Sequence, residues 1–133
     1  GSADYTPYTY RDQMLSALRL QQTKAMQQTN GLTCHQLLIT STKFGQPDTN
    51  ACRLPTLPSF SNTWQAWDAA TNTGVSITNL AVASNDNVSW GILSLSGNQT
   101  INFDSLGRPT ESCAGGCSIV ITGNESTTIK IEA

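Results

Sequence analysis

The chain has few charged residues and no basic run. Asp, Glu, Lys and Arg make up 12% of its 133 residues, and the formal net charge is -2, whereas charged residues are about a quarter of an average soluble protein. The seven Lys and Arg residues are scattered, and Ser, Thr, Asn and Gln supply most of the polarity. A surface of this composition lacks the positive stripe that binds phosphates, so we do not expect nucleic acid as a partner.

The sequence also lacks the usual signatures of enzymes. No G-x-S-x-G, H-E-x-x-H, G-x-G-x-x-G or P-loop pattern occurs. The only histidine, His35, follows Cys34 directly in an expected strand, where it is poorly suited to activate a Ser or Cys nucleophile. We therefore expect a protein that is not an enzyme and that binds no cofactor and no metal.

Long apolar runs are missing as well, and none of the chain reads as a membrane span or a signal peptide. The leading Gly1-Ser2 is typical of a scar left by tag removal, so residues 1–2 are excluded from the fold. The length predicts one domain over residues 3–133. We expect a helical segment within residues 3–30 and a β-rich head over residues 31–133.

A long helix is predicted over residues 5–29, and no other stretch has a comparable helical pattern. Helical spacing is followed by Met14, Leu15, Leu18, Ala25 and Met26, although Gln21 and Gln22 interrupt this apolar stripe. The pattern predicts a helix with one face on a core.

The expected helix ends are marked by polar residues. Asp12 near the start and Lys24 near the end match the sign of the helix dipole. Asn30-Gly31 is a typical stop, because glycine readily adopts the left-handed conformation that ends a helix.

Short segments of alternating apolar residues predict strands in the rest of the chain. Residues 63–72 are compatible with either a strand or a helical turn, and the stretch with Pro55 and Pro58 reads as an extended connection. Six or so antiparallel strands covered on one face by a helix make an α+β fold. The expected strands lie in residues 34–44, 74–83, 88–95, 99–104, 117–123 and 127–133, the last two as a hairpin with Ile119, Ile121, Ile129 and Ile131 inward.

Four cysteines allow three disulfide pairings. Proximity favours Cys34 with Cys52 and Cys113 with Cys117, the second closing a tight loop that contains two glycines. The alternative is a zinc site with four thiolates, although the spacings differ from the usual C-x-x-C pairs. Disulfides would indicate an oxidising compartment.

Three tryptophans are candidates for ligand stacking. Trp90 lies in the clearest strand pattern and is expected in the core. Trp64 and Trp67 lie beside the proline-containing connection, where an exposed face for a surface ligand is the alternative to burial.

Two stretches together resemble a known family. Residues 15–29, which are followed by Asn30-Gly31, resemble the end of the N-terminal helix of type IV pilins. The stretch Thr100-Ile-Asn-Phe-Asp-Ser-Leu-Gly-Arg-Pro109, followed by two Ile-rich strands, resembles the GspH/FimT group of minor pilins and pseudopilins. The matching motif residues are Phe103, Gly107, Arg108 and Pro109, and the helix and the cysteines resemble most a minor pilin of an MSHA-like pilus.

The resemblance implies a type IV pilin-like fold and a structural role. Members have a hydrophobic half-helix that anchors them in the inner membrane, and here that half would precede Ala3 and have been removed. The expected protein is a minor pilin that passes from the inner membrane and periplasm of a Gram-negative bacterium into an extracellular pilus. Its partners would be other pilins, contacted through the N-terminal helix, where Met14, Leu15, Leu18 and Met26 would be the packing residues.

Two other roles stay open. A type II secretion pseudopilin would share the fold and the helix contacts. A pilus-tip adhesin or DNA receptor would instead use the loops near Trp64, Trp67 or the Cys113–Cys117 pair. Some family members bind DNA through a basic C-terminal segment, but this chain ends in Thr-Ile-Lys-Ile-Glu-Ala and has no such cluster.

Overall fold

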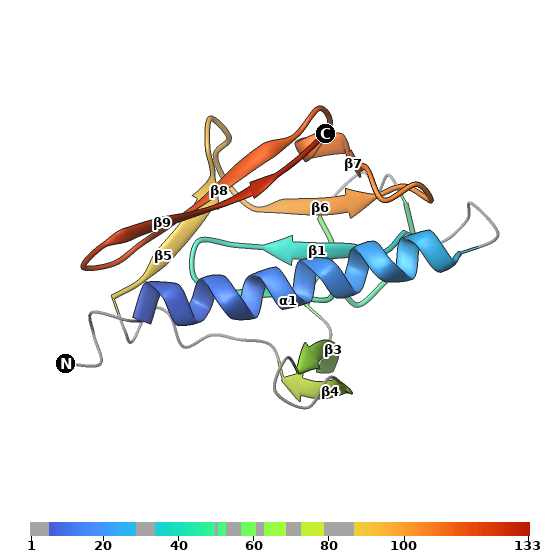
Figure 1. Cartoon of the computed structure of the whole chain (residues 1–133), viewed down its shortest axis with the longest axis horizontal. Coiled ribbons are helices and arrows are strands. Elements are labelled where there is room, and N and C mark those ends of the chain that lie inside the picture. Colours follow the sequence, from blue (N-terminus) through green and yellow to red (C-terminus); the bar gives the residue numbers. More distant parts are fainter. Residues whose placement is uncertain are drawn as a thin grey trace.

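One helix precedes a set of antiparallel sheets (Figure 1). The computed structural model describes residues 6–28, 34–49, 51–52, 57–60, 63–68, 73–78 and 87–133. Every strand pairing found there is antiparallel, so the expected α+β class is confirmed. The elements are α1 (Thr6–Gln27), β1 (Gln36–Ile39), β2 (Phe44–Gly45), β3 (Thr63–Asp68), β4 (Thr73–Thr78), β5 (Ser89–Ile92), β6 (Gln99–Phe103), β7 (Pro109–Thr110), the 3-10 helix η2 (Glu111–Cys113), β8 (Cys117–Thr122) and β9 (Ser126–Ile131).

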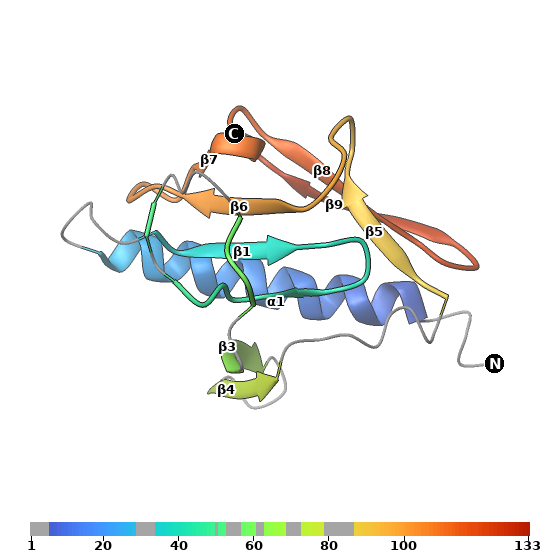
Figure 2. The same ribbon diagram turned by 180° about the vertical axis from the view of Figure 1, so that it is seen from behind.

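The described strands form three groups. A four-stranded sheet has the order β2-β1-β6-β7, a three-stranded sheet has the order β5-β8-β9, and β3 pairs with β4 as a hairpin. Figures 1 and 2 show β1 and β6 running along α1, while β5, β8 and β9 cross at an angle toward the amino-terminal part of the helix. The β3–β4 hairpin contacts α1 through strand β3.

Helix α1 begins earlier than its charge pattern suggests. Pro7 stands in the first turn, where a missing N–H breaks no helical hydrogen bond. Asp12 therefore lies beyond the first turn, and the expectation that it complements the helix dipole there is wrong, while Lys24 does lie in the last turn. The expected stop at Asn30-Gly31 falls outside the described residues.

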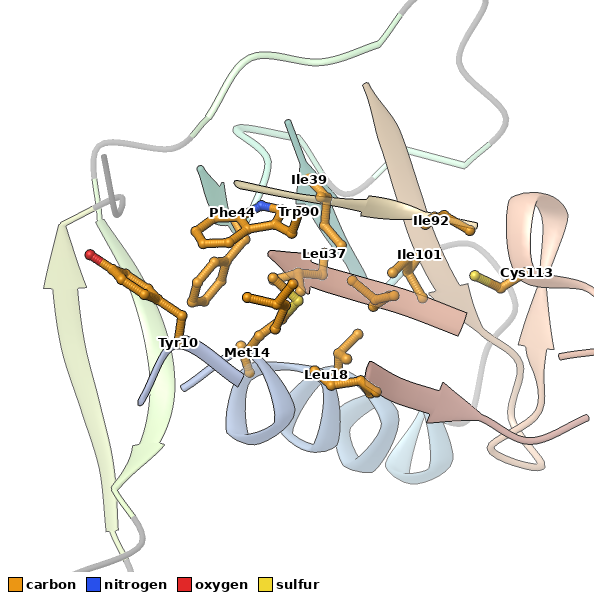
Figure 3. Close-up of a cluster of buried hydrophobic side chains, with 14 of the residues drawn as sticks. Tyr10, Met14, Leu18, Leu37, Ile39, Phe44, Trp90, Ile92, Ile101 and Cys113 are labelled. Carbon is orange, nitrogen blue, oxygen red and sulfur yellow. The ribbon is translucent and has the colours of Figure 1, made fainter. Parts of the chain in front are cut away.

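The core lies between α1 and the two larger sheets (Figure 3). The helix contributes Tyr10, Met14, Ala17 and Leu18, spaced three or four residues apart as one helical face requires. Met26 was expected on the same face, but its side chain is 55% exposed, so that expectation is wrong. Strand residues complete the cluster: Leu37, Ile39, Phe44, Val88, Trp90, Ile92, Ile101, Ile119, Ile121 and Ile129, together with Cys113.

Trp90 joins the helix to both sheets. Its ring centroid lies 5.4 Å from that of Tyr10 and 5.4 Å from that of Phe44. Its indole N–H donates to the Lys43 carbonyl at 3.2 Å, and its backbone N–H donates to the Ser41 carbonyl at 2.9 Å. A buried indole that finds a polar partner in this way satisfies its one donor, and the predicted core position of Trp90 is confirmed.

The predicted terminal hairpin is confirmed, with β8 and β9 in register from Cys117 opposite Ile131 to Thr122 opposite Ser126. Ile119, Ile121 and Ile129 are buried, and Ile131 is partly buried against the core. The undecided segment 63–72 contains strand β3. The single strand expected over residues 34–44 is wrong, because the structure divides it into β1 and the two-residue β2. The two-residue strand β7 was not predicted, because so short a run has no readable alternation.

Polar side chains fill much of the second face of the four-stranded sheet. Gln36 and Asn102 are opposite one another across β1 and β6, and both are buried. The Asn102 amide donates to the Glu111 carboxylate from η2. Within the described residues, Gln36 Nε2 and Asn102 Oδ1 have no hydrogen-bond partner. Two buried polar groups on this face therefore lack the hydrogen bond that such groups usually have.

Candidate functional site

The motif stretch forms a tight turn between β6 and β7. The Asp104 N–H donates to the Arg108 carbonyl at 2.9 Å, and the Gly107 N–H donates to the Asp104 carbonyl at 2.9 Å. Gly107 has a φ of 81°, a conformation that side-chain-bearing residues rarely adopt. The glycine of the motif is thus required by the backbone of this turn.

The Asp104 carboxylate organises the same turn. One oxygen accepts from the backbone N–H groups of Leu106 at 3.0 Å and of Arg108 at 2.9 Å. The other oxygen accepts from Arg108 Nε at 2.9 Å. The backbone N–H of Arg108 is the main cause that lowers the pKa of Asp104, since these bonds favour the charged carboxylate. Asp104 was not among the motif residues singled out above, although an Asp at the start of such a turn is a known signal.

The other motif residues take different positions. Phe103 is partly buried against the core, and it pairs with buried Pro109 across β6 and β7. Arg108 is exposed and its charge is engaged by Asp104. The motif therefore combines a packing pair with a turn that is held from within.

The turn is attached to the carboxyl-terminal half of α1. Gln22 Nε2 donates to the Gly107 carbonyl at 2.7 Å. A Cβ on Gly107 would lie 2.9 Å from the sulfur of Met26, so the glycine also permits the close approach of that side chain. Leu106, beside Gly107, is exposed. The structure thus brings together two parts of the chain that each carry the resemblance.

A groove opens beside this contact, between α1, the β6–β7 turn and the end of β9. Its volume is about 280 Å³. Three of its apolar side chains, Leu15, Phe103 and Ile131, are only partly buried against the core. Charged and polar groups border it, so it is an amphipathic surface. The residues that line it are Leu15, Leu18, Arg19, Gln22, Phe103, Gly107, Ile129, Lys130, Ile131, Glu132 and Ala133.

The four helix-packing residues have different exposures. Met14 and Leu18 are buried in the chain's own core at 0% and 3% exposure, and Leu15 is partly buried against it. Met26 alone is exposed. Met26 and Leu15 are therefore the two members of this set that leave side-chain surface uncovered.

Both favoured cysteine pairs are disulfides. Cys34 is bonded to Cys52, and Cys113 is bonded to Cys117. Cys113 is also fully buried, so the short bridge connects the core to the start of β8. Because all four cysteines are in disulfides, the alternative of a four-thiolate zinc site is wrong. Within the described ranges, no three His, Cys, Asp or Glu side chains are grouped so that they could hold a metal ion.

The remaining candidates are spread over the chain. His35 lies just before β1 and not within a strand as expected. The pKa of His35 is lowered, mainly because the side chain is partly buried and to a smaller extent because the positive charge of Lys24 is near. Trp64 and Trp67 lie on β3, opposite Ile77 and Gly74 of β4.

Comparisons of the chain with protein-family models, curated proteins and solved structures find no match. Among the residues that the structure describes, no helix combines the length and apolar character needed to cross a membrane.

Proposed function

We propose that the protein is a minor pilin, a structural subunit that enters a type IV pilus or initiates its assembly on the bacterial surface. The observation that carries the proposal is the attachment of the Asp104–Pro109 turn to α1 through Gln22 and Gly107. This contact connects the two stretches that resemble type IV pilins and the GspH/FimT group. The proposal includes the pilin-like fold of that group.

The surface of α1 supports a role in lateral packing. Its core face packs on the chain's own sheets, while Gln13, Thr23 and Met26 are exposed along the helix. In a filament, this second face would contact the helices of sister subunits, and the sheets would face outward. Two disulfides suit a subunit that works outside the cell, where thiols are oxidised.

The charge distribution favours a structural subunit over a DNA receptor. Arg11, Arg108 and Lys130 each have a carboxylate within 4.0 Å, from Asp12, Asp104 and Glu132 respectively. Paired cations contribute less to a positive surface, and few remain to release counterions from a phosphate backbone. A type II secretion pseudopilin stays the alternative, because it would use the same helix.

Photo-cross-linking in the native bacterium tests the proposal. A photoreactive amino acid at Gln13 or Thr23 of the full-length protein should give cross-links to pilins encoded beside it. The same amino acid at Asn98, in the exposed β5–β6 turn, is the matched control and should give fewer. Cross-links to secretion pseudopilins would establish the alternative, and no cross-link to any pilin or pseudopilin would contradict both.

A further inference from the structure

The groove between α1 and β9 has the features of a peptide-binding surface. Apolar side chains from three elements line it, and the backbone of an edge strand borders it. We propose that it binds an extended, acidic and apolar segment of a partner protein, which adds a strand to the edge of β9. The inference goes beyond the proposed filament role and does not depend on it.

Strand β9 is at the edge of its sheet. In the described residues it pairs only with β8 (Figure 1). The Leu93 N–H donates to the Ser118 carbonyl, so the backbone groups of Ser118 and Val120 point toward β5. Residues opposite them on β9 then direct their own N–H and C=O groups away from β8. These residues are Lys130 and Thr128.

The outward backbone groups of Thr128 and Lys130 are available to a new strand. No hydrogen bond from another described residue reaches them. Lys130 also lines the groove, so a strand paired with this edge would run beside the apolar lining. Main-chain bonds would give such a complex affinity, and side-chain pockets would give it selectivity.

The lining specifies which side chains the segment carries. Leu15, Phe103 and Ile131 leave apolar surface uncovered, and burying that surface against an apolar side chain is favourable. Alternate residues of a strand point to one side, so every second residue of the segment would be apolar.

The charges on the rim favour an acidic segment. Arg19 is exposed and forms no ion pair with any residue that the structure describes. The Lys130 ammonium lies 4.0 Å from the Glu132 carboxylate, which leaves Arg19 as the cation of the groove lining that has no ion pair among the described residues. A carboxylate on the incoming segment would complement it.

Other occupants satisfy fewer of these features. A helix pairs its backbone groups within its own turns, so it would leave the outward N–H and C=O groups of β9 unpaired. A fatty acid would fill the apolar lining but would leave the outward N–H and C=O groups of β9 unpaired. A second copy paired through β9 would bring another Arg19 and Lys130 to the same region, where like charges repel.

Fluorescence polarisation with synthetic peptides tests the proposal. The probes are labelled heptapeptides that alternate Thr with Val or Ile and carry Glu at one Thr position, and a matched set carries Lys instead. We expect the Glu set to bind at least fivefold more tightly than the Lys set. The Arg19→Glu variant should reverse this preference, while Lys43→Glu, an exposed control on the β1–β2 turn, should retain it.

Backbone pairing is tested at Thr128. Thr128→Pro removes the outward N–H without touching the β8 ladder, and it should weaken binding at least tenfold, whereas Thr128→Ala should not. If Thr128→Pro does not fold, the charge reversal at Arg19 decides. Equal binding of both peptide sets, displacement by dodecanoate without any effect of Thr128→Pro, or a dimer that Thr128→Pro dissociates would each overturn the proposal.

Discussion

Gln22 and Gly107 are separated by 85 residues, yet the Gln22 side chain donates to the Gly107 carbonyl at 2.7 Å. This bond attaches the β6–β7 turn to the carboxyl-terminal half of α1. The same glycine leaves room for Met26, whose sulfur would lie 2.9 Å from an added Cβ. The contact combines a conformational requirement with a packing requirement at a single residue.

Gly107→Ala tests the conformational and the packing requirement together. The φ of 81° should make this change destabilising by about 1–2 kcal/mol. Met26 is exposed and flexible, so we expect the backbone conformation to account for most of the loss. Denaturant unfolding measures it, with Gly91→Ala as the control because a Cβ there meets nothing within 4 Å.

The double variant Gly107→Ala with Met26→Ala then identifies the cause. If the backbone dominates, removing the Met26 side chain should recover less than about half of the loss. Full recovery would show that the close approach of the methionine, and not the left-handed conformation, makes the glycine necessary.

Gln21 gives a prediction of the opposite sign. Its side chain is 2% exposed on the core face of α1, and within the described residues its Nε2 has no hydrogen-bond partner. Gln21→Leu removes a buried unsatisfied donor and should stabilise the protein by about 1 kcal/mol. Gln13→Leu, exposed on the same helix, should change stability by less than about 0.5 kcal/mol. A loss of stability in Gln21→Leu would contradict an unsatisfied amide.

The lowered pKa of Asp104 predicts that the stability of the fold depends on pH in the acidic range. Its pKa in the fold is lowered from 3.8, so its stabilising effect is complete above that value and is lost as the pH falls through the lower, folded-state pKa. Asp104→Asn should therefore be less stable than the wild type at pH 6, by under about 1 kcal/mol because the site is partly exposed. The difference should shrink below about pH 3.8. Unfolding midpoints at several pH values measure it, and a difference that grows on acidification would refute the assigned cause.

The two disulfides should differ in their effect on stability. Their cysteines are 18 and 4 positions apart, so the chain-entropy relation gives about 3 kcal/mol for Cys34–Cys52 and about 2 kcal/mol for Cys113–Cys117. Paired alanine variants compared by denaturant unfolding test this order. Intact mass should also rise by two hydrogens for each bridge on reduction.

Removal of the Cys113–Cys117 bridge should act locally. Because Ile119 and Ile129 remain buried together across β8 and β9, their amide protons should stay protected from exchange in the Cys113→Ala, Cys117→Ala variant. Loss of that protection together with the rest of the core would mean that the bridge is needed for the whole fold.

The sequence by itself determined the local elements. Helical spacing from Met14 to Ala25 and the alternation of Ile119, Ile121 and Ile129 identify a core-facing helix and a terminal hairpin, because both signals repeat within one element. Close spacing also indicated the two disulfide pairs. The resemblance drew attention to Gly107, but not to its partner on the helix.

Only the tertiary structure decided how these elements meet. The exposure of Met26, the burial of Gln21, the bond from Gln22 to Gly107 and the groove beside β9 depend on segments far apart in the chain. Periodicity shows which face of an element is apolar. It does not show which other segment covers that face, since tertiary packing is settled jointly by all the surfaces that must be buried.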